Sequence, residues 1–213
     1  MVLDREAGLR PSGPVFILST VRTGSTLLRY CLDTHPDLLC PPELYLGLAA
    51  TSLFRAVAGL EGSGVSIPLG GTVSAAVAAA NPHVVARVRG ILEELIAPHL
   101  AGQGKRVWCE KSPSNLQHLA LLDQLFPEAR FVCLYRDCRD VAKSLLDFSP
   151  FGYMQELRPY VQASPENTLA ALFRFWADET ALLIDFERQH PDRAHRVRYE
   201  DLVAVLYYLL EGI

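Results

Sequence analysis

The sequence VFILSTVRTGSTLLRYCLD, residues 15–33, joins a short apolar run to a polar turn and then to an amphipathic segment. The run at 15–18 is apolar without interruption, which is typical of a strand buried on both faces of a parallel sheet. Helical spacing follows in the apolar residues Leu27, Leu28, Cys31 and Leu32. A buried strand, a polar turn and a helix in this order are typical of the first unit of a phosphate-binding α/β domain.

Further apolar segments repeat this theme along the chain. Strands are predicted over residues 106–109, 130–135 and 196–199, and helices over 114–126, 138–147 and 165–189. Because strands that alternate with helices form parallel sheets with right-handed crossovers, we predict an α/β fold with three layers around a central parallel sheet.

Length and composition limit the class of protein. The 213 residues, 50% of them hydrophobic and 21% charged, predict a single globular domain over residues 1–213 and exclude a disordered chain. Residues 49–82 are rich in Gly, Ala and Ser with weak periodicity, and we predict a lid or acceptor-binding insertion there. The net charge of -4 disfavours nucleic acid and anionic membranes as partners. An anionic ligand then requires a local cluster of Arg and Lys.

The cysteines and the N-terminus indicate the compartment. Five cysteines, an odd number without a CxxC pair, predict free thiols in a reducing cytosol. No second Cys/His pair completes a zinc site with Cys133 and Cys138, so no metal site is predicted. Residues 1–13 lack an apolar signal core, and no stretch approaches the roughly 18 apolar residues of a membrane span. We therefore expect a cytoplasmic protein without a membrane span.

The turn at residues 19–26 is the first candidate binding site. A helix start aims backbone N–H groups and the positive end of the helix dipole at one point. Gly24 lets the backbone approach a ligand closely, and Arg22 adds a guanidinium that can bind two oxygens. Three hydroxyl donors are added by Thr23, Ser25 and Thr26. A plain helix N-cap is the alternative interpretation. The turn lacks the lysine of the GxxxxGK[ST] loop, which favours a single 5'-phosphate group over a phosphate chain.

Arg136 and Ser144 form the second candidate site. Arg136 ends a predicted strand, and open α/β sheets bind their ligands at the carboxyl ends of strands. Ser144 lies nearly two turns along the following helix, so the two side chains can hold one phosphate from two directions. In the alternative interpretation, the charged residues nearby form a solvated, paired helix face: Arg139, Asp140 and Lys143.

Together these motifs resemble the sulfotransferases that use 3'-phosphoadenosine 5'-phosphosulfate (PAPS). Glu110-Lys111-Ser112-Pro113 is similar to the E-K-[ST]-P element of their bacterial, carbohydrate and polyketide-associated branches. Residues 32–44 are similar to the H-P…E segment of those branches and of tyrosylprotein sulfotransferases. The resemblance runs from about residue 15 to residue 202. It implies the P-loop-like α/β fold of that family.

The resemblance also implies where the donor binds and which residues act. Residues 22–26 are expected to hold the 5'-phosphosulfate, and Arg136 with Ser144 the 3'-phosphate. Glu43 is the expected general base, which takes the proton of the attacking hydroxyl in an in-line displacement. Lys111 and Arg22 are expected to stabilise the charge on the departing adenosine 3',5'-bisphosphate, and the scheme requires no metal.

The residues alone leave alternatives for these two catalytic positions. Glu43 can also be an acid that complements a helix start, and Lys111 a solvated lysine at a strand end. The acceptor is a hydroxyl on a carbohydrate, a lipid, a polyketide or a peptide. Two other functions fit less well: a P-loop-type nucleotide-dependent kinase, which requires Mg²⁺, and a truncated, non-catalytic binding domain.

The C-terminal segment departs from the family's pattern. After Tyr199-Glu200-Asp201-Leu202 the family continues for several tens of residues and supplies a basic loop over the nucleotide, whereas this chain ends at Ile213. We therefore expect a C-terminally short fold: a shortened member, a truncated one, or one completed by a partner. The apolar residues of the last stretch are consistent with self-association or an unfinished core.

Overall fold

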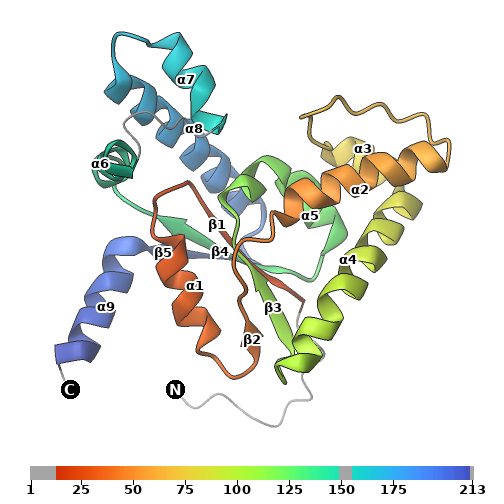
Figure 1. The fold of residues 1–213 in the computed structure, drawn as a ribbon, viewed down its shortest axis with the longest axis horizontal. Helices are drawn as coiled ribbons and strands as arrows, with labels where there is room; N and C mark the ends of the chain where they lie inside the picture. The colour runs from red at the N-terminus through yellow and green to blue at the C-terminus, as the bar shows by residue number, and fades with distance from the viewer. Residues whose placement is uncertain (1–12, 149–154, 212–213) are drawn as a thin grey trace.

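The computed structural model describes residues 13–148 and 155–211 (Figure 1). Its centre is a five-stranded parallel sheet with the strand order β2-β3-β1-β4-β5. The strands are β1 (Val15–Ser19), β2 (Leu38–Leu39), β3 (Val107–Glu110), β4 (Arg130–Tyr135) and β5 (Ala194–Arg198). The chain thus has the α/β fold with a central parallel sheet that its sequence predicts.

The middle strand, β1, is covered on both faces, which explains its uninterrupted apolar sequence. Phe16, Ile17 and Leu18 are fully buried. β1 pairs in parallel with β3 on one edge and with β4 on the other. The ring of Phe16 stacks on that of Phe131 in β4, with 5.6 Å between ring centroids. The apolar run therefore fills two cores at once, as a central parallel strand requires.

Helices cover both faces of the sheet (Figure 1). On one face, α1 (Ser25–Asp33) and the start of α9 (Tyr199–Glu211) pack with Ile17. On the other face, the core that contains Phe16 is shared by α2 (Leu46–Leu60), α4 (Pro82–Gly102), α5 (Leu119–Leu125) and α8 (Thr168–Gln189). Further helical segments are α3 (Ala75–Ala80), α6 (Cys138–Phe148), α7 (Arg158–Ala163) and the 3-10 turns η1 (Pro113–His118) and η2 (Gln155–Leu157). Sheet and helices together make three layers.

Several helices differ from the sequence prediction. The helix predicted over 114–126 consists of the 3-10 turn η1 followed by α5. Residues 49–82 include most of α2 and all of α3, and α2 buries Ala50, Phe54 and Val57 in the core. Among its described lining residues, the main cavity of the molecule has none from 49–82. The lid or acceptor-binding role of this segment stays a prediction.

Other predictions concern partners and compartment. Within residues 13–148 and 155–211, no helix combines the length and the apolar character that a membrane crossing requires. All five cysteines are free thiols. The described residues contain no cluster of three side chains suited to a metal ion. On α9, the apolar residues Val203, Val205 and Tyr208 are exposed, and self-association through this helix stays a prediction.

Candidate active site

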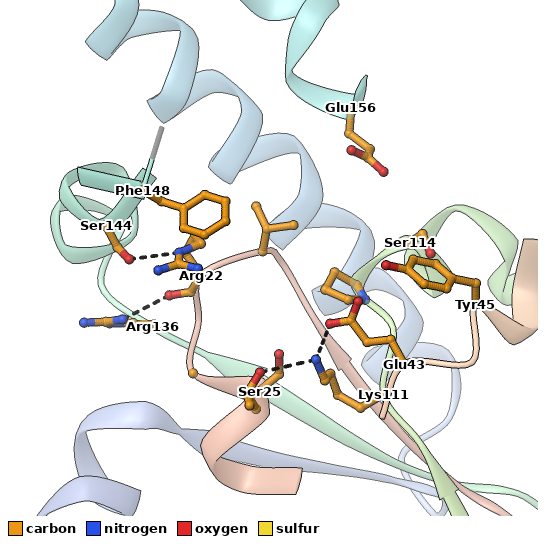
Figure 2. A pocket seen from close by; sticks show the side chains of 14 residues that line it. Arg22, Ser25, Glu43, Tyr45, Lys111, Ser114, Arg136, Ser144, Phe148 and Glu156 are labelled. Carbon is orange, nitrogen blue, oxygen red and sulfur yellow. Dashed lines mark hydrogen bonds and ion pairs between the residues drawn. The ribbon is translucent and has the colours of Figure 1, made fainter. Parts of the chain in front are cut away.

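A cavity of about 560 Å³ opens at the carboxyl ends of β1, β3 and β4 (Figure 2). Eight of the nine site residues predicted from the sequence line it: Arg22, Gly24, Ser25, Thr26, Glu43, Lys111, Arg136 and Ser144. They come from the turn after β1, the start of α1, the segment before α2, the residues after β3 and β4, and helix α6. Segments far apart in sequence thus meet at the sheet edge where open α/β sheets bind ligands.

The turn between β1 and α1 brings the backbone close to this cavity. Its conformation is left-handed at Arg22 (φ 63°) and at Gly24 (φ 90°). A Cβ on Gly24 would lie 2.3 Å from the ring of Tyr199, so the position requires glycine. Gly24 is the N-cap of α1, and no side chain among residues 13–148 and 155–211 caps this helix. The plain N-cap role considered for the Ser and Thr residues is therefore wrong, and the first N–H groups of α1 lack intrahelical acceptors.

Thr23 is the predicted site residue that does not line the cavity. Its side chain is buried, and its Oγ1 donates a hydrogen bond to the carbonyl oxygen of Thr20 at 2.8 Å. The hydroxyl therefore stabilises the turn, and the role of Thr23 in binding a ligand stays a prediction.

Two guanidinium groups gather at one end of the cavity (Figure 2). Nε of Arg22 donates to Oγ of Ser144 at 3.0 Å, and its guanidinium lies 4.4 Å from the ring centroid of Phe148. Arg136 donates from Nη1 to the carbonyl oxygen of Arg22 at 3.0 Å, and its guanidinium lies 4.2 Å from the ring centroid of Tyr199. Ser144 thus contacts Arg22 directly, a pairing that the sequence did not predict.

These arginines lack a negative partner in the described part of the chain. Neither Arg22 nor Arg136 forms an ion pair there, and the buried Nε of Arg136 has no hydrogen-bond partner. Adjacent like charges repel, and a buried donor without an acceptor costs free energy. An anion between the two guanidiniums and the uncapped start of α1 would satisfy all three groups.

Lys111 and Glu43 form an ion pair at the opposite end of the cavity, between Nζ and Oε1 (Figure 2). The Lys111 side chain is 5% exposed, and its Nζ also donates to Oγ1 of Thr26 at 3.4 Å. Lys111 is therefore not the solvated lysine considered from the sequence. Glu43 lies outside α2 and points to Lys111, so it does not complement a helix start as the alternative held.

Other cavity residues gave no recognisable sequence signal. Tyr45 lies beside Glu43, and its hydrogen bond to that carboxylate raises the pKa of the phenol. Phe148, at the end of α6, and Glu156, in η2, line the outer part. Only the fold brings these side chains to one cavity.

A second cavity, of about 460 Å³, adjoins Arg136 on its other side. Two ion pairs line it: Nη2 of Arg139 lies 2.9 Å from Oδ2 of Asp137, and Nε of Arg198 lies 3.8 Å from Oε2 of Glu200. Arg139 is 81% exposed on its side chain. Arg139 is thus solvated and paired, but with Asp137, which precedes α6, and not with the helix residues Asp140 and Lys143 that the alternative named. Arg136 lines both cavities.

Comparisons with known proteins agree with this geometry. A family model described as the Sulfotransferase family matches residues 14–207. The nodulation protein NoeE of Sinorhizobium fredii (strain NBRC 101917 / NGR234) is 30% identical over 198 residues, which are 88% of this chain and 46% of NoeE. Human protein-tyrosine sulfotransferase 1 is 28% identical over 132 residues, 62% of this chain and 33% of that protein. The chain thus spans less than half the length of these two relatives.

Two solved structures share the fold. The sulfotransferase domain from the curacin biosynthetic pathway superimposes with a TM-score of 0.61 at 23% identity, over 94% of this chain and 71% of that domain. The sulfotransferase domain of the Synechococcus PCC 7002 olefin synthase gives 0.54 at 24% identity, over 100% and 75%. Fold, cavity and family match agree, and the chain belongs to the sulfotransferase family.

Proposed function

We propose that this chain transfers a sulfuryl group from PAPS to an acceptor hydroxyl. The observation that carries the proposal is the division of charge within one cavity. Within the described residues, Arg22 and Arg136 have no counter-ion at one end, beside the start of α1, which no described side chain caps, and the Lys111–Glu43 pair stands at the other. One end is thus suited to an anion, and the other to a proton transfer.

The donor end is formed by the turn after β1 together with Arg136 and Ser144. Residues 22–26 would hold the 5'-phosphosulfate through backbone N–H groups, the hydroxyls of Ser25 and Thr26 and the Arg22 guanidinium. Arg136 and Ser144 would hold the 3'-phosphate, with the free Nε of Arg136 as one donor. PAPS supplies an activated sulfuryl group, and the protein supplies its position.

The reaction end is formed by Glu43 and Lys111. The acceptor oxygen forms a bond to sulfur while the bond from sulfur to the phosphate oxygen breaks, in line. Glu43 takes the proton that the acceptor hydroxyl loses, a contribution of about 10²–10⁴-fold to the rate. Lys111 and Arg22 neutralise the negative charge that develops on the departing phosphate oxygen, so no metal is needed.

The acceptor would enter beside Tyr45, Ser114 and Glu156, which line the cavity around Glu43. The acceptor hydroxyl belongs to a carbohydrate, a lipid, a polyketide or a peptide. Among the relatives, the printed names include a nodulation protein, protein-tyrosine sulfotransferases and a domain of the curacin pathway. A reducing cytoplasm fits the free cysteines and is proposed as the compartment.

Thermal melting tests the donor site before any acceptor is known. Adenosine 3',5'-bisphosphate at about 100 times its dissociation constant adds roughly 2.7 kcal/mol to the stability, which raises Tm by about 5–10 °C. We expect this rise with the bisphosphate and none with ATP and Mg²⁺. A rise only with ATP and Mg²⁺ would favour a kinase. No rise with either would contradict a nucleotide site and favour a non-catalytic domain.

Arg136→Ala gives the same test at one residue. Because a hydrogen bond to a charged group contributes about 1.5–3 kcal/mol, we expect the dissociation constant of the bisphosphate to rise about 10–100-fold. Calorimetric titration measures this change. Arg188→Ala is the matched control, since Arg188 is an exposed arginine on α8 that pairs with Asp185 and lies outside the cavity lining. Equal affinity in the two variants would overturn the assignment of Arg136.

A further inference from the structure

The residues after β3 divide between two sides of the backbone. Lys111 faces the cavity, whereas Glu110 and Ser112 face the segment that precedes α2. Alternation of this kind follows from the period of two in an extended chain. Glu110 and Ser112 are both completely buried, as is Asn115 in η1. The motif thus has a second set of polar side chains that the transfer chemistry does not use.

This second set binds the backbone beside Glu43. The N–H of Leu44 donates to Oε1 of Glu110 at 3.3 Å, and the N–H of Tyr45 donates to Oγ of Ser112 at 2.9 Å. These are the two residues that directly follow Glu43 in the chain. These two bonds therefore fix the position of the Glu43 backbone relative to the end of β3, from which Lys111 extends.

Asn115 extends the same contact to the start of α2. Its Oδ1 accepts a hydrogen bond from the N–H of Gly47 at 2.9 Å. A Cβ on Gly47 would lie 2.7 Å from Cβ of His118 and 2.9 Å from Oδ1 of Asn115, so the two segments touch as closely as glycine allows. The start of α2 therefore cannot shift without breaking this contact.

Glu110 is the centre of the network. Its carboxylate also accepts hydrogen bonds from the hydroxyl of Ser112 and from Nδ2 of Asn115. Burial raises the pKa of Glu110, and the hydrogen bonds from Ser112, Asn115 and the backbone of Leu44 oppose that rise. The N–H of Leu44 and the amide of Asn115 can only donate to this carboxylate, so the network requires an acceptor at this position.

Tyr45 shows that the network holds a strained conformation. Its φ of 52° is left-handed, a conformation that is unfavourable for a residue with a Cβ. This turn directs Glu43 toward Lys111 and places Tyr45 against the cavity. Such strain persists only where the surroundings over-determine the backbone, and the hydrogen bonds of Glu110, Ser112 and Asn115 do so here.

We propose that Glu110 is a positioning residue that sets Glu43 and Lys111 at their working separation through the backbone of residues 44–47. Ser112 and Asn115 act with it. The catalytic consequence rests on the proposed function, but the positional claim does not. The end of β3 thus supplies Lys111 directly, and through Glu110 it also holds the backbone that carries Glu43.

Hydrogen exchange tests the positional claim without any acceptor. Glu110→Gln keeps the shape but turns an amide NH₂ toward groups that already donate, so we expect the amides of Leu44, Tyr45 and Gly47 to exchange about 10–100-fold faster. Ser112→Ala is the milder variant, with the effect largest at Tyr45. Glu94→Gln, an exposed carboxylate of α4 outside the network, is the control. Unchanged protection of these amides in both network variants, with the fold intact, would overturn the proposal.

A double-mutant cycle tests the catalytic consequence. With PAPS as donor and either 4-nitrophenol or water as acceptor, we expect Glu110→Gln to lower kcat about 10–100-fold and to leave the dissociation constant of the bisphosphate within about threefold. The same substitution in a Glu43→Ala background should cause almost no further loss. A full second loss would show that Glu110 acts otherwise than through Glu43. No turnover by the parent protein would contradict the proposed function, and hydrogen exchange would still decide the positional claim.

Discussion

Glu43 and Lys111 depend on each other's charge. A buried ammonium group is costly unless a carboxylate faces it, and Lys111 is almost completely buried. Removal of Glu43 would therefore leave an unpaired positive charge inside the cavity. An anionic ligand can supply the missing charge, so the two partners of this pair affect donor binding in opposite directions.

Glu43→Ala is expected to separate turnover from binding. Turnover should fall by about 10²–10⁴-fold because the base is gone, while the affinity for adenosine 3',5'-bisphosphate stays the same or rises because Lys111 gains an open side. Steady-state kinetics and calorimetric titration measure the two quantities. Glu94→Ala, an exposed carboxylate of α4, should change neither. Equal losses of turnover and affinity would remove Glu43 from the role of base.

Individual site residues could be predicted where they belong to a recognisable motif, but the contacts between them could not be predicted. The sequence pattern predicted Arg22, Lys111 and Arg136 because each follows a recognisable apolar run. The bond between Arg22 and Ser144 joins residues 122 positions apart, and no local pattern reports such a pair. The sequence likewise did not show that Glu110 binds the backbone beside Glu43, because Leu44 lies 66 positions away in the chain.

At the scale of elements, the turn between β1 and α1 is set by Gly24. A side chain here meets both a left-handed backbone and the ring of Tyr199. Because that ring also carries the guanidinium of Arg136, a displacement of Tyr199 would move a donor-site residue as well. Stability and the proposed nucleotide binding would thus be coupled at this turn.

Gly24→Ala and Gly90→Ala should therefore change stability in opposite directions. We expect Gly24→Ala to lower the free energy of unfolding by about 1–3 kcal/mol and to weaken bisphosphate binding. Gly90 lies inside α4, and a methyl group at this position would have no other atom within 4 Å, so Gly90→Ala should raise stability by about 0.5–1 kcal/mol. Urea denaturation measures both changes. Equal stability of the two variants would show that Gly24 is not required for the turn.

Elements with a strong local pattern were predicted, and the others were missed. β1 and β4 are apolar runs that only a central strand explains. β2 has two residues and leaves no pattern. α4 was not predicted, because its first turns follow a stretch of Ala and Gly without periodicity. Its buried residues nevertheless recur at every fourth position, at Val84, Val88, Leu92 and Ile96.

At the scale of the whole molecule, the stability of the chain depends on pH through Glu179. This carboxyl of α8 is 8% exposed and accepts a hydrogen bond from Nε2 of Gln117 at 2.5 Å. Burial raises its pKa to about 7, and repulsion from Glu156 and Asp178 adds to the rise. The folded protein therefore holds this proton more tightly than the unfolded chain, whose ordinary value is 4.5.

The sign of the effect follows from this difference. Below about pH 4.5 Glu179 is protonated in both the folded and the unfolded state, so its burial does not lower the stability of the fold. The stability falls as the pH rises toward 7, and the loss is complete above about pH 7. Glu179→Gln should be more stable than the parent at pH 8 by at most about 3 kcal/mol, with the difference shrinking toward pH 5. Thermal melts across this range measure it. Glu94→Gln is the exposed control, and a loss of stability in Glu179→Gln that is equal at every pH would contradict the prediction.

The central position of β1 has a consequence for synthesis of the chain. β1 leaves the ribosome early, but its partners β3 and β4 begin at Val107 and Arg130. At translation rates of about 5–20 residues per second, the apolar strand waits on the order of 5–20 s with both edges unpaired. Other nascent chains can pair with such edges, so we expect a chaperone to protect this strand during translation. The pairing of β1 with later strands, which assembles the cavity from distant segments, thus also prolongs the time in which the growing chain can misassemble.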